Sequence, residues 1–388
     1  MILKNCRLVP ELSEPHGYSA ADIEINQGKI VSIAETQPER ACSEEIIDCQ
    51  GHTLLPGLFD LHAHLSIASA EETPDTAMRR LIQTIPRLSA YTDLGVTSIR
   101  DCGSCLRLTL PLRDAIAENI LEGPMIQAAG YMLGPREMEK MGREMTMTMS
   151  IADNESGFYH AACYEREKGA DFIKIYASSS ASRMAAQSSH SGLRAIMTRE
   201  EIGAVVKAAE ERGTYVAAHA HALEAIKSCI EEGVRTIEHG TFIDDETIEL
   251  LLKKDGSYLV PTLSVLVDEE VPDEREYSSE LREAAERIGR AYRAGCKMGF
   301  GTDLYNGELS RFPQEFRIRK ELCGMRDLDI LLQATKYSAE IIGAAEQTGT
   351  VKAGLRADLI LVDGNPDQDI SVMYKKPLMV FQNGERQR

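Results

Sequence analysis

An alternation of short apolar runs with amphipathic helical stretches occupies the chain from residue 53 to residue 349. The runs are rich in β-branched residues and bounded by turn residues, a pattern typical of parallel strands joined by helices. The runs lie at residues 53–62, 96–101, 124–130, 171–178, 215–221, 235–240, 258–263 and 297–303. Eight strands with intervening helices predict an α/β fold of the (β/α)8 barrel type, the TIM barrel. An open doubly wound sheet is the alternative, but no G-x-G-x-x-G follows the first run to favour a dinucleotide-binding fold.

The helical stretches carry their own start and stop signals. In TREEIGAVVKAAEERG, Thr198 is followed three residues later by Glu201, which predicts a capping box, and Gly213 predicts the end of the helix. The stretches at residues 222–233 and 244–256 also end at glycine. Helices are therefore expected between the later strands of the barrel.

The two flanks of the chain differ from its middle. Residues 1–52 and 350–388 contain short predicted strands and turns, such as the one at Gln27-Gly28, but no long helical period. Neither flank is long enough to build a good core alone. We therefore expect the two ends to combine into one small β-sandwich domain beside a barrel formed by residues 53–349.

Composition limits the partners and the compartment. A formal net charge of −18 disfavours nucleic acid, because phosphate binding needs a basic face. The sequence has no run of 18 apolar residues and no apolar signal-peptide core, so we expect a cytoplasmic protein that does not enter membranes. The odd count of 9 cysteines argues against a disulfide framework, and the C-x-x-C pair of Cys102 and Cys105 is expected to be structural. The expected partners are a small-molecule substrate and further copies of the chain.

The first run ends in GLFDLHAHL, which places His62 and His64 two residues apart. Alternate side chains of a strand point to the same side, so the two imidazoles would project together. Neutral imidazole is a good ligand for zinc and similar ions, and such a pair can bind one metal ion. The alternative is two polar residues where a strand meets a loop.

Other residues of ligand type fall at or near the ends of later strands. In a (β/α)8 barrel the carboxyl ends of all strands meet at one face, where active sites are found. The candidates beyond the first run are Lys174, His219, His221, His239 and Asp303. Their convergence on one face predicts a metal site there.

This set of motifs resembles the amidohydrolase superfamily, in its type with two metals bridged by a carboxylated lysine. The shared pattern is H-x-H on the first strand, Lys on the fourth, His on the fifth and sixth, and Asp on the eighth. The segment KAGLRADLILVD in the C-terminal flank is typical of the family's β domain. The segment AAHAHALEAIKSCIEEGVRTIEHGT is most similar to the imidazolonepropionase-like and Xaa-dipeptidase, or prolidase-like, branch.

The resemblance implies two divalent metal ions, with zinc the first candidate although manganese, cobalt and iron accept the same ligands. It implies that one ion is held by His62, His64 and Asp303. It implies that the other is held by His219 and His239. A desolvated lysine amine can add carbon dioxide, and the resulting carbamate on Lys174 would bridge the two ions.

The implied reaction uses a metal-bridging hydroxide, with Asp303 as proton shuttle to the leaving amine. His221 would bind the substrate or stabilise the oxyanion, although either member of the H-x-H pair could be the ligand. Tyr176 faces the same side as Lys174 and could hydrogen-bond the substrate, or could be an aromatic residue of the barrel layer. Asp101, at the end of the second strand, is the rival shuttle.

We therefore expect a hydrolase of amide bonds, first of all a dipeptidase or an N-acyl amino acid hydrolase. The same site could serve a cyclic amide, as in an imidazolonepropionase-like enzyme, a lactone or a phosphoester. A deaminase is disfavoured because Glu224 lies too far from His221 for an H-x-x-E pattern. A catalytically inactive relative is the alternative of another class. The long connections 131–150, rich in methionine, and 179–195, with SSSAS where dipeptidases often have glycines, are expected over the active site.

Overall fold

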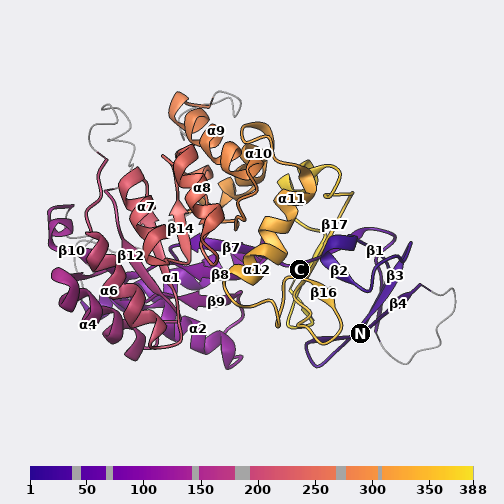
Figure 1. Ribbon diagram of the computed structural model, residues 1–388. Helices are drawn as coiled ribbons and strands as arrows, with labels where there is room; N and C mark the ends of the chain where they lie inside the picture. The colour runs from indigo at the N-terminus through magenta and orange to yellow at the C-terminus, as the bar shows by residue number, and fades with distance from the viewer. Residues whose placement is uncertain are drawn as a thin grey trace.

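The computed structural model describes residues 1–36, 45–66, 73–141, 148–179, 193–267, 277–304 and 308–387. Figure 1 shows two parts, a barrel surrounded by helices and a β domain near which both chain ends lie. No helix within these residue ranges is long and apolar enough to cross a membrane.

The barrel is built from parallel strands. Its strands are β7 (Leu58–Ala63), β8 (Val96–Asp101), β9 (Met125–Ala128), β12 (Ile173–Tyr176), β13 (Val216–Ala220), β14 (Thr236–His239) and β15 (Tyr258–Val260). Parallel pairing joins β7 to β8 and β9, and joins β12 through β13 and β14 to β15. The gap between β9 and β12 is bridged by the amide of Asp171, which donates to the carbonyl of Ala128 at 2.8 Å. Together with the segment around Met298, described next, this order confirms the predicted (β/α)8 barrel.

The eighth strand is irregular. The predicted strand at 297–303 forms only an isolated bridge, in which Met298 pairs with Leu259 of β15. On its other side the amide of Leu61 in β7 donates to the carbonyl of Phe300 at 2.8 Å. The segment therefore closes the barrel with two backbone hydrogen bonds on each side in place of a regular ladder.

The first predicted strand was wrong in its length, because the run 53–62 is divided at Gly57. Its first part is β6 (Thr53–Pro56), which pairs with the β domain, and its second part is β7 of the barrel. A Cβ atom at Gly57 would lie 2.0 Å from Oγ1 of Thr97, so only glycine allows this close passage between the two domains.

The methionine-rich connection is more ordered than a loop. It contains β10 (Met132–Pro135) and β11 (Met149–Ala152), and β10 extends the sheet by pairing with β12. Residues 142–147 of this connection and 180–192 of the serine-rich connection lie outside the described residues.

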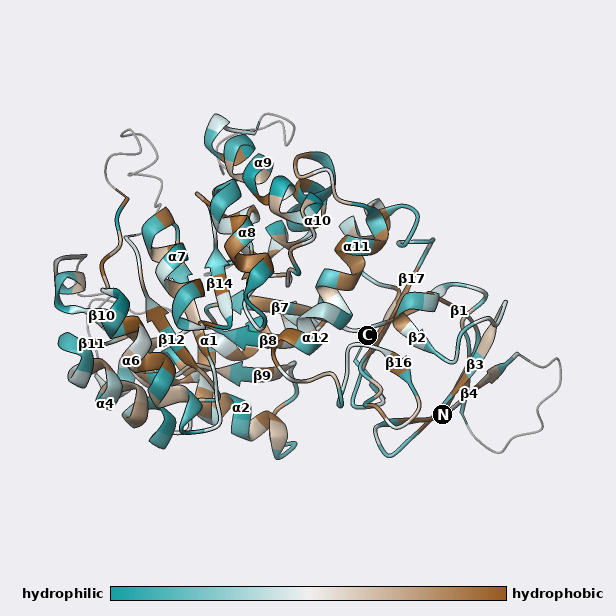
Figure 2. Ribbon diagram, in the orientation of Figure 1, coloured by the Kyte–Doolittle hydropathy of each residue, from teal (hydrophilic) through white to brown (hydrophobic). Residues whose placement is uncertain are grey.

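Helices cover the barrel. They are α1 (Pro74–Asp93), α2 (Thr109–Ala117), α4 (Asn154–Glu167), α6 (Arg199–Glu210), α7 (Leu223–Glu232), α8 (Asp245–Lys253), α9 (Ser279–Arg293), α10 (Phe312–Glu321), α11 (Asp327–Leu332) and α12 (Ser338–Ile341). The predicted capping box is confirmed at α6, where Thr198 and Glu201 each accept a hydrogen bond from the other's amide. Figure 2 shows that the barrel helices carry both hydrophilic and hydrophobic residues, as expected for helices with one buried face.

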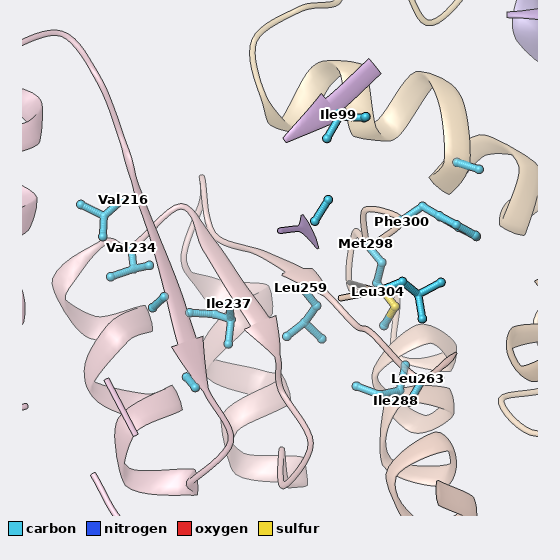
Figure 3. Packing of buried hydrophobic residues seen from close by; sticks show 14 of the residues in the cluster. Ile99, Val216, Val234, Ile237, Leu259, Leu263, Ile288, Met298, Phe300 and Leu304 are labelled. Atoms are coloured by element: carbon cyan, nitrogen blue, oxygen red, sulfur yellow. The ribbon is translucent and has the colours of Figure 1, made fainter. Parts of the chain in front are cut away.

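The helices bury their apolar faces against the strands. Figure 3 shows Ile237 and Leu259 on neighbouring strands, and Ile288 of α9 close to Leu263. These side chains belong to one large buried cluster and are at most 2% exposed. Their packing fixes the strand ends from which the candidate ligands project.

The β domain takes strands from both ends of the chain, as predicted. Its sheet runs in the order β19-β18-β17-β6-β1-β3-β4, with β5 paired to β1. The bounds are β1 (Ile2–Leu8), β3 (Ala21–Asn26), β4 (Lys29–Glu35), β5 (Ile46–Asp48), β17 (Leu359–Val362), β18 (Met379–Gln382) and β19 (Glu385–Arg386), while β2 (Ser13–Glu14) pairs with β16 (Val351–Lys352). A separate core that includes Leu3, Ile23 and Phe381 fills the domain. The residue boundaries of the two domains, at 52/53 and 349/350, stay predictions.

Candidate metal centre

The strand ends bring the predicted ligand residues together in two groups. In each group, one ligand atom from every residue lies within 4.8 Å of the others. The first group is His62, His64 and Asp303, and the second is His219, His221 and His239. The rings of His62 and His239 lie 4.7 Å apart between their centroids, so the two groups are adjacent.

Contacts within each group are close. Oδ1 of Asp303 lies 3.5 Å from Nε2 of His62 and 3.3 Å from Nε2 of His64. In the second group, Nδ1 of His219 lies 3.0 Å from Nε2 of His239. The ring of His221 stacks on that of His239 at 4.4 Å, so either member of the H-x-H pair is near enough to share an ion with His239.

Two of these residues have unusual backbone conformations. His239 has φ of 70° and Asp303 has φ of 56°, a left-handed region that costs free energy for residues with a side chain. Glu238 points into the barrel, where it meets His62, and regular strand alternation would turn His239 away from that side. The left-handed turn brings His239 back to the face where the other ligands lie.

Asp303 is held in place by the first strand. Its amide donates to the carbonyl of His62 at 2.7 Å, and the hydroxyl of the preceding Thr302 donates to the buried carboxylate of Asp60 at 2.6 Å. A Cβ atom at Gly301 would lie 3.0 Å from Cβ of His62, so glycine permits this close approach. The irregular eighth strand thus places the carboxylate of Asp303 next to His62 and His64.

Most of the imidazoles have their Nδ1 atom occupied by an oxygen of the protein. The pairs are His62 with Glu238 Oε2 at 2.8 Å, His64 with the Gly103 carbonyl at 2.8 Å, His221 with Thr241 Oγ1 at 2.8 Å, and His239 with Thr262 Oγ1 at 2.7 Å. Such partners orient a ring and leave Nε2 for a metal or a substrate. A carbonyl and a carboxylate only accept, so His62 and His64 carry their proton on Nδ1.

The charge states of most of these side chains favour the binding of a metal cation. Burial, followed by the charge of Lys174, lowers the pKa of His62 to about 4, and burial lowers the pKa of His221 to about 3. Burial alone would raise the pKa of Asp303, but His62 and His64 hold it below its usual value. Conversely, burial would lower the pKa of His64, but Asp303 raises it. The neutral rings of His62 and His221 and the ionised Asp303 are the forms that bind divalent metals, whereas His64 favours the protonated form and would release its Nε2 proton on binding one.

Lys174 lies in β12 with 1% of its surface exposed. Its Nζ atom has no hydrogen-bond partner among the described residues, although a buried amine without a partner is costly. Its charge lowers the pKa of His62 in the first group and of the three histidines in the second, which places it within electrostatic reach of each group. An unsatisfied lysine beside two clusters of ligand type fits the predicted pair of metals, while carboxylation of Lys174 stays a prediction.

Asp101, the rival proton shuttle, is fully buried. It accepts hydrogen bonds from the amides of Leu65 and Gly103 and from the hydroxyls of Ser104 and Thr109. These contacts fix the loop that offers the Gly103 carbonyl to a ligand histidine. Asp303, with 20% of its side chain exposed, is the carboxylate that opens to the site.

Tyr176 stacks on His219, with 3.7 Å between ring centroids and 15° between planes. It also packs in a small buried cluster with Met132, Met138 and Met149, so part of the methionine-rich connection supports the site. Tyr176 therefore orients the ring of a candidate ligand, and contact between its hydroxyl and a substrate stays a prediction. Glu224 is exposed at the start of α7, as expected if it takes no part in the chemistry.

Four residues of the site were not identified from the sequence. Glu238 and Arg100 are charged residues inside apolar strands, and this signal could have found them. Thr241 and Thr262 are ordinary loop residues, and nothing in the sequence distinguishes them.

A (β/α)8 barrel with two clusters of ligand residues at its carboxyl-terminal face has the architecture of a metal-dependent hydrolase. The family model described as "Amidohydrolase family" matches residues 53–386. The chain belongs to the amidohydrolase family, whose members are hydrolases that generally bind divalent metals.

Three proteins with similar sequences or structures show which members of the family this chain resembles. Ochratoxinase from Aspergillus niger is 28% identical over 367 residues, which cover 84% of this chain and 73% of the relative. The crystal structure of a Xaa-Pro dipeptidase with methionine bound in its active site is 27% identical, with a TM-score of 0.85 over 99% of this chain and 98% of the other. A prolidase complexed with N-methylphosphonate-L-proline is 29% identical, with a TM-score of 0.82 over the same shares. These matches confirm the predicted resemblance to prolidase-like members of the family.

Proposed function

We propose that this protein is a two-metal hydrolase of amide bonds that acts on dipeptides or N-acyl amino acids. The observation that carries the proposal is a pair of adjacent clusters of ligand-type residues, with the charge of the buried Lys174 acting on histidines of both. The similarity to a Xaa-Pro dipeptidase and to a prolidase bound to a proline phosphonate supports a peptide-like substrate. A cytoplasmic location and a homo-oligomeric state remain part of the proposal.

The ligands divide between two ions. His62, His64 and Asp303 would hold one divalent ion, while His219 and His239 would hold the other. Lys174, as a carbamate, would contact both. When bound, the ions, with zinc as first candidate, would polarise the scissile carbonyl and increase the acidity of a water molecule.

Asp303 would move the proton. Its depressed pKa keeps it ionised, so it can accept a proton from the attacking water on a carboxylate oxygen. It would then donate that proton to the nitrogen of the leaving amine as the C–N bond breaks. An amide needs this second transfer more than an ester does, because an unprotonated amine is a poor leaving group.

His221 would act on the carbonyl oxygen. Oγ1 of Thr241 lies 2.8 Å from its Nδ1 atom, and if that hydroxyl donates, the neutral ring would carry its proton on Nε2. This N–H would stabilise the oxyanion that develops during attack. His219 would then be the metal ligand of the pair, held in position by Tyr176.

The test is a metal analysis followed by a substrate screen. Protein purified with Zn²⁺ and bicarbonate should contain close to two equivalents of metal per chain. It should release amino acids from a panel of dipeptides that includes Xaa-Pro, or from N-acyl amino acids, as detected by mass spectrometry. Well-folded protein that stays metal-free would refute the proposal. Activity confined to lactones or phosphoesters would refute its amide specificity.

A further inference from the structure

A buried ion pair lies inside the barrel, in contact with His62 of the group His62, His64 and Asp303. Nη2 of Arg100, on β8, donates to Oε1 of Glu238, on β14, at 2.7 Å, and both side chains are 0% exposed. The other carboxylate oxygen of Glu238 accepts from Nδ1 of His62 at 2.8 Å. Three side chains from three strands thus form one continuous hydrogen-bonded chain.

The guanidinium is fixed on every side. Nε of Arg100 donates to the carbonyl of Leu61 at 2.6 Å, and Nη1 donates to Oγ1 of Thr236 at 2.9 Å. Because Leu61 is the residue before His62, Arg100 also fixes the backbone that carries this ligand. A buried ion pair adds little to stability compared with apolar residues of similar size, so stability alone does not account for it.

His62 differs in this respect from the other ligand histidines. His64 faces a backbone carbonyl, and His221 and His239 face threonine hydroxyls. Among the histidines of the two clusters, a carboxylate contacts Nδ1 only at His62 within the described part of the chain.

The same region holds a third group of ligand type, formed by His62, Glu238 and Cys102. It is not a further metal site, because the guanidinium of Arg100 lies against Glu238 and already balances its charge. The group therefore supports a ligand and does not bind an ion itself.

We infer that Glu238 is a positioning residue that fixes the tautomer of His62 and strengthens metal binding by the cluster of His62, His64 and Asp303, with Arg100 aligning its carboxylate. The inference rests on the two-metal function proposed above. By accepting a hydrogen bond from the protonated Nδ1 of His62, Glu238 leaves the lone pair of Nε2 free to bind the metal. Its negative charge makes the imidazole a stronger donor.

The decisive variant is Glu238→Gln. A glutamine has one acceptor oxygen, which can serve either Arg100 or His62, and its NH2 group then faces the other donor. We expect one of the two Zn²⁺ ions to bind about 10–100-fold more weakly, measured by competition with a chromophoric chelator. The kcat should fall while KM stays unchanged, and the visible spectrum of the Co²⁺-loaded protein should change. Glu238→Asp keeps the charge and should recover part of the lost affinity.

Glu315→Gln is the matched control. Glu315 also forms a fully buried pair, with Nε of Arg319 at 2.9 Å, and it contacts none of the ligand histidines in the described ranges. Its Oε2 atom accepts from the amides of Leu263 and Ser264. This control should lower the melting temperature while the ion held by His62, His64 and Asp303 binds as tightly as in wild type. An equal loss of Zn²⁺ affinity in both variants would overturn the inference.

The inference fails separately from the proposed function. Wild-type protein that binds two Zn²⁺ ions, together with a Glu238→Gln variant of unchanged affinity, would refute only the role of Glu238. Wild-type protein without metal would refute the proposed function and the inference with it. If Glu238→Gln does not fold, Glu238→Asp decides, since a shortened side chain that binds both ions as tightly as wild type contradicts a positioning role.

Discussion

Replacing Lys174 with methionine should have opposite effects on the metal-free and the metal-loaded protein. Without metal, the Nζ atom is buried and has no hydrogen-bond partner among the described residues, so it destabilises the fold. Methionine has a similar length and flexibility but no polar group to desolvate. Asp303, which loses a positive neighbour, keeps its contact with Nε2 of His64 at 3.3 Å. Metal-free Lys174→Met should therefore be more stable than metal-free wild type.

The expected gain in stability of metal-free Lys174→Met follows from the burial of the lysine amine in wild type. An unsatisfied buried polar group costs about 1–3 kcal/mol. For a chain of 388 residues, an unfolding entropy of about 2.1 cal/mol/K per residue converts 1 kcal/mol into roughly 1.2 °C. We expect the melting temperature of the metal-free variant to rise by about 1–4 °C.

The metal-loaded protein should respond in the other direction. At about 100 times the dissociation constant, a bound ion adds about 2.7 kcal/mol to stability. Wild type should gain this in Zn²⁺ and bicarbonate, whereas Lys174→Met lacks the bridging ligand and should gain much less. Differential scanning calorimetry of both proteins, with and without metal, measures the two effects. Lys207→Met, an exposed change on α6, is the control and should shift neither midpoint by more than about 1 °C.

Two results would refute this reasoning. A metal-free variant that melts below wild type would show that Lys174 is satisfied in the folded protein. An equal metal-induced rise in both proteins would show that the lysine is not a ligand.

Three further outcomes are expected. Asp303→Asn should keep much of its metal but lose turnover by about 10²–10⁴-fold, most for poor amine leaving groups, and near-normal steady-state rates would contradict its role as shuttle. His221→Asn should retain two metal equivalents while kcat falls about 10²–10³-fold, and loss of an ion in metal analysis would make His221 the ligand instead of His219. Folding lowers the pKa of His62 from 6.5 to about 4, so below pH 6.5 the unfolded chain binds more protons than the folded chain. The stability of the metal-free protein should be full above pH 6.5 and decrease towards pH 4, and a urea midpoint that does not change from pH 8 to pH 5 would contradict this.

The barrel and the ligand-type residues at its strand ends could be predicted from the sequence because both depend on local patterns. An apolar run between turn residues favours a buried strand, and a capped amphipathic stretch such as residues 198–213 favours a helix. Once the strands are counted, barrel geometry gathers their carboxyl ends. His62, His64 and Lys174 could therefore be assigned to one face without coordinates.

Where the chain departs from regular strands depended on tertiary packing. The run 53–62 shows no break in its apolar character at Gly57, and its division there follows from the closeness of Thr97 and from pairing with a strand more than 300 residues away. The irregular pairing of the eighth strand also depends on tertiary structure, because this segment has to pair with Leu259 on one side and with Leu61 on the other.

The surroundings of the ligands were decided only by the tertiary structure. Arg100 and Glu238 are 138 residues apart, and their pairing depends on the closure of the barrel, which no local pattern records. The same holds for Thr241 and Thr262, whose hydroxyls orient two histidines only because short loops place them there. Hydrogen bonds need donor and acceptor within about 3 Å. Residue types and periodicity determine which groups face the site, but only the packed barrel sets distances of that precision.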